Sequence, residues 1–290
     1  MPQVFCFGLG YCALAFARHL QAQGWRVAGT CRTPEKADQL RALGITTHIF
    51  ADAPMTAAPA ALAGATHLLS SVPPGEAGDP VVAAHSADIA ATHGLQWIGY
   101  LSTTGVYGDR QGGWVEETSS LAPTTARGRR RVAAERAWAA LAAGMGVPVH
   151  MFRLAGIYGP GRNQLVSLRN GTARRIHKPG QVFSRIHVDD ITQVLAAAAT
   201  SGLPSQAFNV CDDEPAAPDA VVAYAARLLG VEPPPVTAFD AAELSPMARS
   251  FYSESKRVSN RRIKTALGVR LTYPTYRDGL RALAQAGEGS

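Results

Sequence analysis

The amino-acid sequence predicts an α/β fold: a doubly wound parallel sheet followed by a small C-terminal lobe. Over the first two-thirds of the chain, short apolar segments alternate with amphipathic segments of helical length, and a glycine-rich turn follows the first apolar segment. Strands that alternate with helices in this way form βαβ units, in which successive strands are parallel. Hydrophobic residues make up 47% of the 290 residues, so the chain can bury a sizeable core.

Turn and capping residues bound the predicted strands and helices. Thr33 and Pro34 are typical of a helix N-cap and a first helical position, and Asp79 and Pro80 repeat that pair. Glycines close these helices and the one before them. In order, we expect strands at 3–8, 25–30, 45–50, 66–72, 96–103 and 147–154, and helices at 12–24, 33–44 and 79–94, with a further helix before the last of these strands.

Beyond about residue 165 the alternation loosens. A late strand is expected near 208–210, and helices are expected at 219–230 and 256–268, on either side of a proline-rich segment at 231–246. Doubly wound sheets bind their ligands at the carboxyl ends of the strands. We therefore expect these later segments to form a smaller lobe over the strand ends.

The turn after the first strand has the pattern Gly-x-Gly-x-x-Ala, formed by Gly8, Gly10 and Ala13. Glycine is needed where a turn is tight and where the backbone approaches a pyrophosphate, and the following helix N-terminus offers free N–H groups. A tight turn without a ligand is the alternative explanation. At the first turn of an alternating sheet we favour a dinucleotide site, with Tyr11 beside Gly10 as a further contact.

The residues after the second strand favour NADP(H) over NAD(H). An NAD-binding chain commonly has an acidic residue about 20 residues beyond the glycine turn, which binds the ribose 2′-hydroxyl. Here Arg32 follows the strand, where a 2′-phosphate would lie, and the next carboxylate is Glu35. A solvated surface arginine is the alternative. Asp52, after the third strand, and Ser70, near the end of the fourth, complete the predicted cofactor contacts. We predict a dinucleotide-binding Rossmann domain over residues 1–165 plus about 186–211, and a substrate lobe over about 166–185 and 212–285.

Composition narrows the classes of partner and the compartment. The net charge of +6 suits an anionic ligand as well as a nucleic acid. The basic runs RGRRR and RNGTARRIHK have no interleaved aromatic residues, so we expect no nucleic-acid partner. The four cysteines form no C-x-x-C pair, and no disulfide framework is expected. Because no apolar run is long enough to span a bilayer and no signal-peptide pattern occurs, we expect a cytoplasmic protein without a membrane partner.

Five landmarks occur in order along the chain: LSTTGVYGD (101–109), FRLAGIYGPGR (152–162), RIHVDDI (185–191), FNVCDDEP (208–215) and SKRVSNRRIKTALG (255–268). Together they resemble motifs of the short-chain dehydrogenase/reductase superfamily. The resemblance is to its extended or atypical branch, the NAD-dependent epimerase/dehydratase group, and it spans nearly the whole chain. It implies a Rossmann fold, a nicotinamide cofactor and a C-terminal substrate lobe.

In that superfamily a Ser or Thr binds the substrate oxygen, a Tyr transfers the proton, and a Lys binds the nicotinamide ribose and lowers the Tyr pKa. The resemblance places these roles on Thr103, Arg127 and Arg131, so the Tyr-x-x-x-Lys motif reads Arg-x-x-x-Arg here. Arginine stays protonated near neutrality and is a poor proton donor. We expect Arg131 to bind the ribose and Arg127, one helical turn earlier, to bind an anionic group of the substrate.

These replacements leave the proton donor open. Tyr107, four residues after Thr103, and Tyr158 are candidates, although packing or cofactor contact is the commoner role of tyrosines at these positions in the family. The family's asparagine after the sixth strand is also missing. Thr104-Gly105 stands where the nucleotide-sugar 4,6-dehydratases carry Asp-Glu, which excludes that activity.

His187, Asp189 and Asp190 form the cluster that comes nearest to a metal-site pattern. A metal site would need further His or Cys ligands, and the sequence shows no second cluster of them. We expect the aspartates to cap the helix that follows and His187 to pack, with no metal.

Two functions are compatible with these observations. The first is an NADP(H)-dependent oxidoreductase or epimerase that acts on a small anionic carbonyl compound or a nucleotide-sugar-like substrate. The second is a catalytically silent, NADP(H)-sensing regulatory protein, which the loss of the tyrosine motivates. We favour the enzyme because the landmarks of the substrate lobe persist. The resemblance also allows a homodimer formed through the helices that flank the active site.

Overall fold

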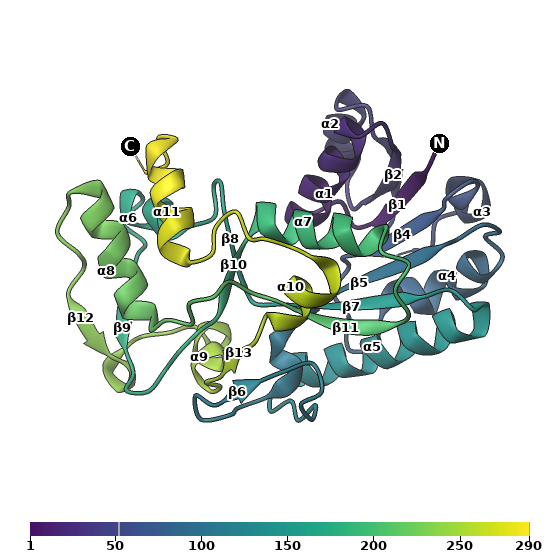
Figure 1. The fold of residues 1–290 in the computed structure, drawn as a ribbon. Coiled ribbons are helices and arrows are strands. Elements are labelled where there is room, and N and C mark those ends of the chain that lie inside the picture. The colour runs from purple at the N-terminus through teal and green to yellow at the C-terminus, as the bar shows by residue number, and fades with distance from the viewer. Residues whose placement is uncertain (52, 290) are drawn as a thin grey trace. The chain divides into compact units, whose positions relative to one another are not determined.

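The computed structural model describes residues 1–51 and 53–289 of the chain (Figure 1). Its contacts divide the chain into two compact units, each assembled from three stretches of sequence. The first unit comprises Met1–Thr103, Ala126–Arg153 and Ile191–Phe208. The second comprises Thr104–Thr125, Leu154–Asp190 and Asn209–Ser290.

Within the described residues, the first unit is built on a seven-stranded sheet of β1 (Gln3–Phe7), β2 (Arg26–Cys31), β3 (Thr46–Ile49), β4 (His67–Ser70), β5 (Trp97–Thr103), β7 (Val149–Leu154) and β11 (Gln206–Val210). The strand order is β11-β7-β5-β4-β1-β2-β3. The pairs β1/β2, β1/β4, β2/β3 and β4/β5 are parallel. The strand order reverses between β1 and β4, and doubly wound sheets bind ligands at the carboxyl ends beside such a reversal. The predicted doubly wound fold is confirmed.

The helices of this unit are α1 (Tyr11–Ala22), α2 (Pro34–Ala42), α3 (Ala58–Leu62), α4 (Pro80–Ala90), α5 (Ala126–Met145) and, from Ile191 on, α7 (Val188–Ala199). They cover both faces of the sheet (Figure 1). On one face, Ile89 of α4 and Trp138 of α5 join Phe5 of β1 in a buried core that also includes α3. On the other, Phe16 of α1 lies 6.5 Å from Trp97 of β5 between ring centroids. No helix in the described ranges is long and apolar enough to cross a membrane.

Two of these helices begin at the caps that the sequence predicts. Thr33 Oγ1 accepts a hydrogen bond from Lys36 N–H at 3.3 Å, and Pro34 follows as the first helical residue of α2. Asp79 Oδ1 accepts hydrogen bonds from the first N–H groups of α4, that of Val81 at 3.0 Å among them. Because each cap satisfies backbone donors that the helix cannot, the helix start is fixed locally.

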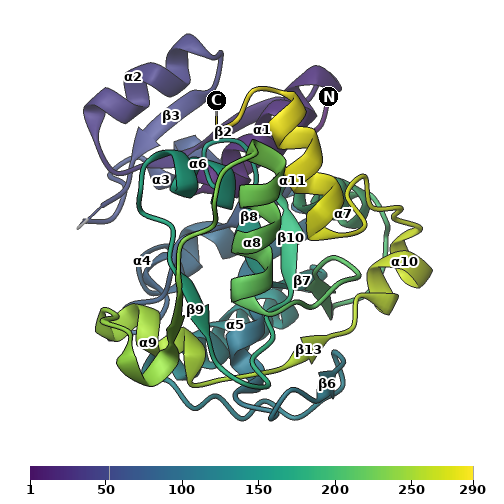
Figure 2. The same cartoon turned by 90° about the vertical axis from the view of Figure 1, so that its left-hand side faces the viewer.

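Within the described residues, the second unit packs short helices against three pairs of short parallel strands (Figures 1 and 2). Its core includes Tyr158, Leu165, Tyr224, Tyr276 and Leu280. The strand pairs are β8 (Gly156–Tyr158) with β10 (Arg185–His187), β9 (Arg175–His177) with β12 (Val236–Ala238), and β6 (Trp114–Val115) with β13 (Arg257–Val258). The helices are η1 (Thr104–Tyr107), α6 (Gln164–Arg169), α8 (Pro218–Leu229), η2 (Phe239–Ala241), α9 (Pro246–Tyr252), α10 (Arg261–Leu267) and α11 (Tyr276–Gln285).

The prediction of one helix over 256–268 is wrong. The segment begins as β13, and α10 starts only at Arg261. The backbone N–H of Arg257 donates to the Gly113 carbonyl at 2.9 Å, and that of Ser259 donates to the Val115 carbonyl at 2.9 Å. Pairing with a strand distant in sequence therefore overrides the local helical pattern. The predicted domains are defined by what they bind, the cofactor or the substrate, whereas the two units are defined by contacts. The bounds of the predicted domains therefore stay predictions.

Candidate functional site

The glycine turn between β1 and α1 is held by residues of two neighbouring strands and their loops. The Gly8 N–H donates to Thr30 Oγ1 at 2.8 Å, and the Ser71 hydroxyl donates to the Gly8 carbonyl. Gly8 has a φ of +81°, a region that favours glycine. A Cβ there would also lie 3.0 Å from both Ser71 Oγ and Val72 Cγ2. The first glycine is therefore required by the turn itself.

Gly10 is different, because the described chain places no atom within 4 Å of the position that its Cβ would take, its immediate neighbours apart. Its φ of −84° and ψ of −165° are extended backbone that any residue can adopt. Neither backbone conformation nor internal packing requires glycine here. The open space lies at the N-terminus of the 12-residue helix α1, whose first turn carries no acidic side chain. A pyrophosphate that approaches the backbone would fill this space and meet the positive end of the helix dipole.

Arg32 supplies a positive charge just beyond the end of β2. It is exposed, and no described residue forms a hydrogen bond or an ion pair with it. Its position follows from local structure, because β2 ends at Cys31 and Thr33 caps α2. Burial raises the pKa of the Cys31 thiol, so no thiolate opposes the guanidinium. Arg32 is therefore available to an anionic ligand at this edge of the sheet.

The other predicted cofactor contacts differ in exposure. Tyr11 is the first residue of α1 and is 36% exposed. Ala13 is fully buried, as expected where the helix packs closely on the sheet. Ser70, at the end of β4, is also fully buried, and its Oγ has no hydrogen-bond partner among the described residues. Asp52 lies outside the described residues. The roles of all four in cofactor binding stay predictions.

Arg131 of α5 is anchored to the end of β5. Its Nη1 donates to the Leu101 carbonyl at 2.6 Å and to the Tyr100 hydroxyl at 3.2 Å. Its Nε is buried without a partner, and Nη2 forms no hydrogen bond with the described part of the chain. Burial raises the pKa of Tyr100, which therefore keeps its proton. Arg131 thus fixes the helix to the strand, and its Nη2 group remains for a ligand.

Thr103 and Arg127 belong to the same unit as Arg131. Thr103 is the last residue of β5 and is half-buried, whereas Arg127 is the second residue of α5 and is exposed. Because Arg127 and Arg131 are four residues apart on one helix, they lie on the same face of it. Their catalytic roles, and that of Thr103, stay predictions.

A buried ion pair supports the same helix one turn further on, and sequence reasoning missed it. The side chains of Glu135 and Arg153 are each 7% exposed, and Arg153 Nη2 lies 2.8 Å from Glu135 Oε2. Arg153 Nε donates to Glu135 Oε1 at 3.2 Å, and the Ser102 hydroxyl donates to the same oxygen at 2.5 Å. These three residues join β5, β7 and α5 next to Thr103. The sequence signal for this pair is that Glu135 lies on the same helix face as Trp138. A glutamate on a buried helix face needs a positively charged partner.

Tyr107 lies in the second unit and is fully buried. Its hydroxyl donates to Asn209 Oδ1 at 2.6 Å. Asn209 is itself fully buried, and its backbone N–H donates to Glu117 Oε1 at 2.9 Å. These bonds match the packing role that tyrosines at this position commonly have. The catalytic role of Tyr107 stays a prediction.

His187 packs between two tyrosine rings, as expected. Its ring centroid lies 5.1 Å from that of Tyr158 and 4.2 Å from that of Tyr273. It accepts a hydrogen bond from Asp189 N–H at 3.2 Å, and burial lowers the pKa of its ring. The Asp190 carboxylate accepts the Tyr273 N–H at 3.1 Å. Across residues 1–51 and 53–289, no group of three His, Cys, Asp or Glu side chains could hold a metal ion.

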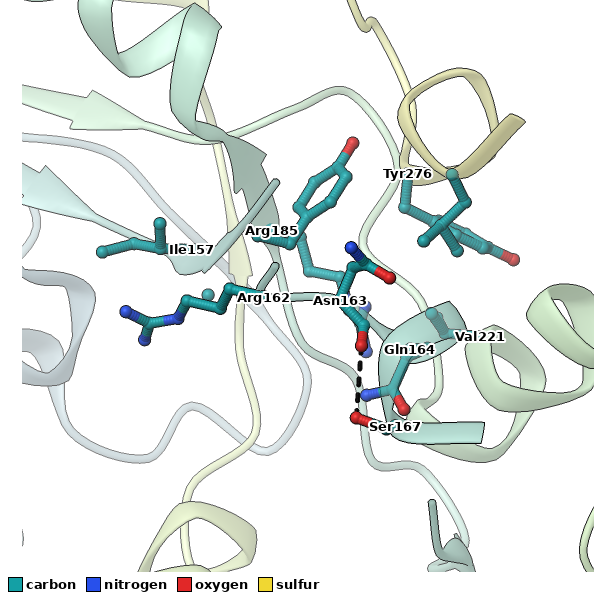
Figure 3. A pocket seen from close by; sticks show the side chains of 11 residues that line it. Ile157, Arg162, Asn163, Gln164, Ser167, Arg185, Val221 and Tyr276 are labelled. Carbon is teal, nitrogen blue, oxygen red and sulfur yellow. Dashed lines mark hydrogen bonds between the residues drawn. The ribbon is translucent and has the colours of Figure 1, made fainter. Parts of the chain in front are cut away.

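The second unit also contains a pocket of about 270 Å³ (Figure 3). Its wall lies between β8, β10, α6, α8 and α11 and combines apolar side chains with arginine, amide and hydroxyl groups. Arg185 and Tyr276 are part of this wall, and the sequence analysis singled out neither of them.

The model of the NAD-dependent epimerase/dehydratase family matches residues 8–211, from the first glycine of the turn to the residue after β11. The chain belongs to the NAD-dependent epimerase/dehydratase family. This confirms the resemblance to the extended or atypical short-chain dehydrogenases/reductases.

Several relatives of this family member are similar over most of its length. Protein YeeZ of Escherichia coli (strain K12) is 31% identical over 246 residues, which cover 81% of this chain and 86% of YeeZ. A solved structure of a functionally unknown conserved protein from Silicibacter pomeroyi DSS is 52% identical, with a TM-score of 0.90, and the match covers 99% of this chain and 100% of that one. UDP-glucuronic acid 4-epimerase from Bacillus cereus, solved in complex with UDP-glucuronic acid and NAD, is 16% identical with a TM-score of 0.79 over 97% of each chain. The last comparison shows the shared fold.

Proposed function

We propose that this family member binds NADP(H) at the glycine turn and acts as an oxidoreductase or epimerase on a small carbonyl compound or nucleotide-sugar-like substrate that carries a negative charge. The observation that carries the proposal is the open space over Gly10 at the N-terminus of α1. Glycine at this position has no internal cause, so a ligand that needs close backbone approach accounts for it. Membership of a family described by its NAD dependence supports the same cofactor class.

The preference for NADP(H) over NAD(H) rests on Arg32. An exposed guanidinium without a protein partner at the end of β2 would form charge-assisted hydrogen bonds with a 2′-phosphate. A 2′-hydroxyl would gain much less from the same side chain. Glu35, the nearest carboxylate in the sequence, lies in the first turn of α2.

The proposed chemistry divides among three residues of the first unit. When bound, the dinucleotide supplies or accepts a hydride. The Thr103 hydroxyl binds the substrate oxygen, and Arg131 Nη2 binds the ribose hydroxyls while Nη1 keeps its place on Leu101. Arg127 binds the anionic group of the substrate. Since arginine does not release its proton near neutrality, the proton comes from another group or from water.

The first experiment compares NADPH with NADH by calorimetric titration of the wild type and Arg32→Asp. The loss of charge-assisted hydrogen bonds of about 1.5–3 kcal/mol predicts that NADPH affinity falls about 10- to 150-fold, and NADH affinity changes far less. Arg18→Asp, an exposed arginine of α1, is the control and leaves both affinities unchanged. Equal losses for the two nucleotides in Arg32→Asp would contradict the NADP(H) preference.

A catalytically silent NADP(H) sensor is the second candidate, and Arg127 in the tyrosine position favours it. Absorbance at 340 nm separates the two when NADPH is mixed with a panel of anionic carbonyl compounds and nucleotide sugars. Turnover that Thr103→Val abolishes, while NADPH affinity is kept, supports the enzyme. If NADPH binds tightly and no member of the panel is reduced, the sensor is the better account.

A further inference from the structure

Arg185 is a partly buried cation that forms no ion pair within the described residues. Its Nη1 donates to the Phe183 carbonyl at 2.8 Å and to the Ala216 carbonyl at 3.1 Å. No carboxylate of the described residues lies within ion-pair distance of it, and Nε and Nη2 form no hydrogen bond with them. Burial lowers the pKa of Arg185, although an arginine keeps its charge near neutrality. A desolvated charge of this kind normally has a counter-charge.

Among the described residues, the acidic side chains around Arg185 form no ion pair with it. Asp212 is 1% exposed, and burial raises its pKa to about 8, although the nearby positive charge of Arg185 opposes that rise. Its Oδ2 has no hydrogen-bond partner among the described residues. Glu214 is already paired with Arg277, whose Nε lies 3.0 Å from Glu214 Oε1. Arg185 therefore lines the pocket without an ion-paired carboxylate among the described residues.

Two tyrosine hydroxyls in the wall of the same pocket also lack partners. Tyr158 is 7% exposed and Tyr276 is 1% exposed, and neither hydroxyl has a hydrogen-bond partner in the described structure. The end of the Tyr158 side chain lies against α11, where a Cβ at Gly279 would come within 2.1 Å of the Tyr158 oxygen. Buried polar groups are normally satisfied, but these two hydroxyls are themselves inaccessible, so the unbonded Nε–Nη2 edge of Arg185 is the observation that indicates a missing ligand.

The size of the pocket and the rest of its wall limit which ligand can fit. Val221, Leu280 and the ring of Tyr276 form apolar wall, and the volume of about 270 Å³ lies below the range of about 300–1,000 Å³ for drug-sized ligands. Gln164 stands beside Ser167 on the α6 side, and Arg162 extends away from them on the side of Ile157 (Figure 3). A small molecule with an apolar body fits this space, whereas a whole dinucleotide does not.

We propose that this pocket of the second unit binds a small organic acid, with Arg185 holding its carboxylate. Because Nη1 is used by two carbonyls, the Nε–Nη2 edge remains, and two parallel N–H donors match a planar carboxylate. The apolar wall then holds the body of the acid. The proposal concerns binding by these residues and does not rest on the proposed dinucleotide function.

The test is a calorimetric titration of the full chain without nucleotide. The ligands are benzoate and 3-phenylpropanoate, the matched amides benzamide and 3-phenylpropanamide, and inorganic phosphate. We expect at least one acid to bind at least tenfold more tightly than its amide and more tightly than phosphate. Arg185→Gln removes this preference, Arg185→Lys keeps part of it, and Arg270→Gln, at an exposed arginine of the same unit, leaves it unchanged.

A second variant keeps the test valid if Arg185→Gln does not fold by circular dichroism. Gln164→Trp adds bulk from a half-buried position in the wall and leaves Arg185 and its hydrogen bonds in place. It weakens binding of the acids at least tenfold if the pocket is their site. Equal binding of acid and amide, tighter binding of phosphate, no binding of either acid to the wild type, or unchanged binding in Gln164→Trp would each overturn the proposal.

Discussion

The two glycines of the first turn respond to the same substitution in opposite ways. Gly8→Ala places a Cβ at a φ of +81° and 3.0 Å from two side-chain atoms. Gly10→Ala places one in extended backbone, where no described atom beyond its chain neighbours lies within 4 Å. The first substitution therefore acts on the folded protein, and the second acts on whatever occupies the space over the turn.

The magnitudes follow from these geometries. A left-handed conformation costs an alanine about 1–2 kcal/mol, and two contacts at 3.0 Å add to that, so Gly8→Ala lowers the free energy of unfolding by about 2 kcal/mol or more. At a compatible backbone position, Gly→Ala restricts the unfolded chain and stabilises by about 0.4–1 kcal/mol. Gly10→Ala should therefore leave the nucleotide-free protein as stable as the wild type or slightly more so. Its effect on NADPH is a loss of affinity of about tenfold or more, or about 1.4 kcal/mol, because the Cβ occupies the path of the pyrophosphate.

Two measurements check this pair. Urea unfolding without nucleotide gives the stability of both variants, and calorimetric titration gives their affinity for NADPH. The reasoning is refuted if Gly10→Ala is stable and binds NADPH as tightly as the wild type, since the open space would then serve another purpose. Destabilisation of Gly10→Ala by more than about 1 kcal/mol would show that the glycine has a structural cause after all.

Three further predictions concern the supporting structure. Glu135→Gln breaks a buried ion pair and should lower the free energy of unfolding by about 3–5 kcal/mol, part of which the double variant with Arg153→Met restores; additive losses in urea unfolding would contradict this. Because burial raises the folded-state pKa of Asp212 to about 8, its protonated form stabilises the fold, and this contribution is lost as pH rises from about 4 to 8. Wild-type stability should therefore fall relative to Asp212→Asn over that range, and parallel profiles would refute the assignment. Tyr107→Phe should cost about 1–3 kcal/mol through the lost bond to Asn209 and leave NADPH affinity unchanged, whereas lost turnover at unchanged stability would indicate catalysis.

The cofactor side was the more predictable part of the protein because its signals are local. Strand and helix alternate with short spacing, and Thr33 and Asp79 cap helices that begin at the next residue. The contrast between Gly8 and Gly10 was less accessible. Both are glycines of one motif, and only the positions of Ser71 and Val72 show that the first is required sterically.

The second unit was less predictable because its segments are short and pair with distant ones. β13 pairs with β6, which lies more than a hundred residues earlier, and no pattern within 256–268 signals that partner. The ion pair of Glu135 and Arg153 could not be predicted for the same reason. The two charges are recognisable as partners only when β7 is known to lie close to α5.

By itself, the sequence determined the fold class, the order of the main strands along the chain and the glycine turn. These features depend on residue types only a few positions apart in the sequence. They can therefore be predicted from local backbone preferences and helical spacing. That Arg127 and Arg131 stand in the usual Tyr and Lys positions stays a prediction. Only the tertiary structure decided that Arg131 is tied to Leu101 and that, among the described residues, Gly10 faces open space and Arg185 forms no ion pair. Each of these observations depends on which groups lie around a residue in space. Burial and charge pairing are set by those neighbours, which are often distant in sequence.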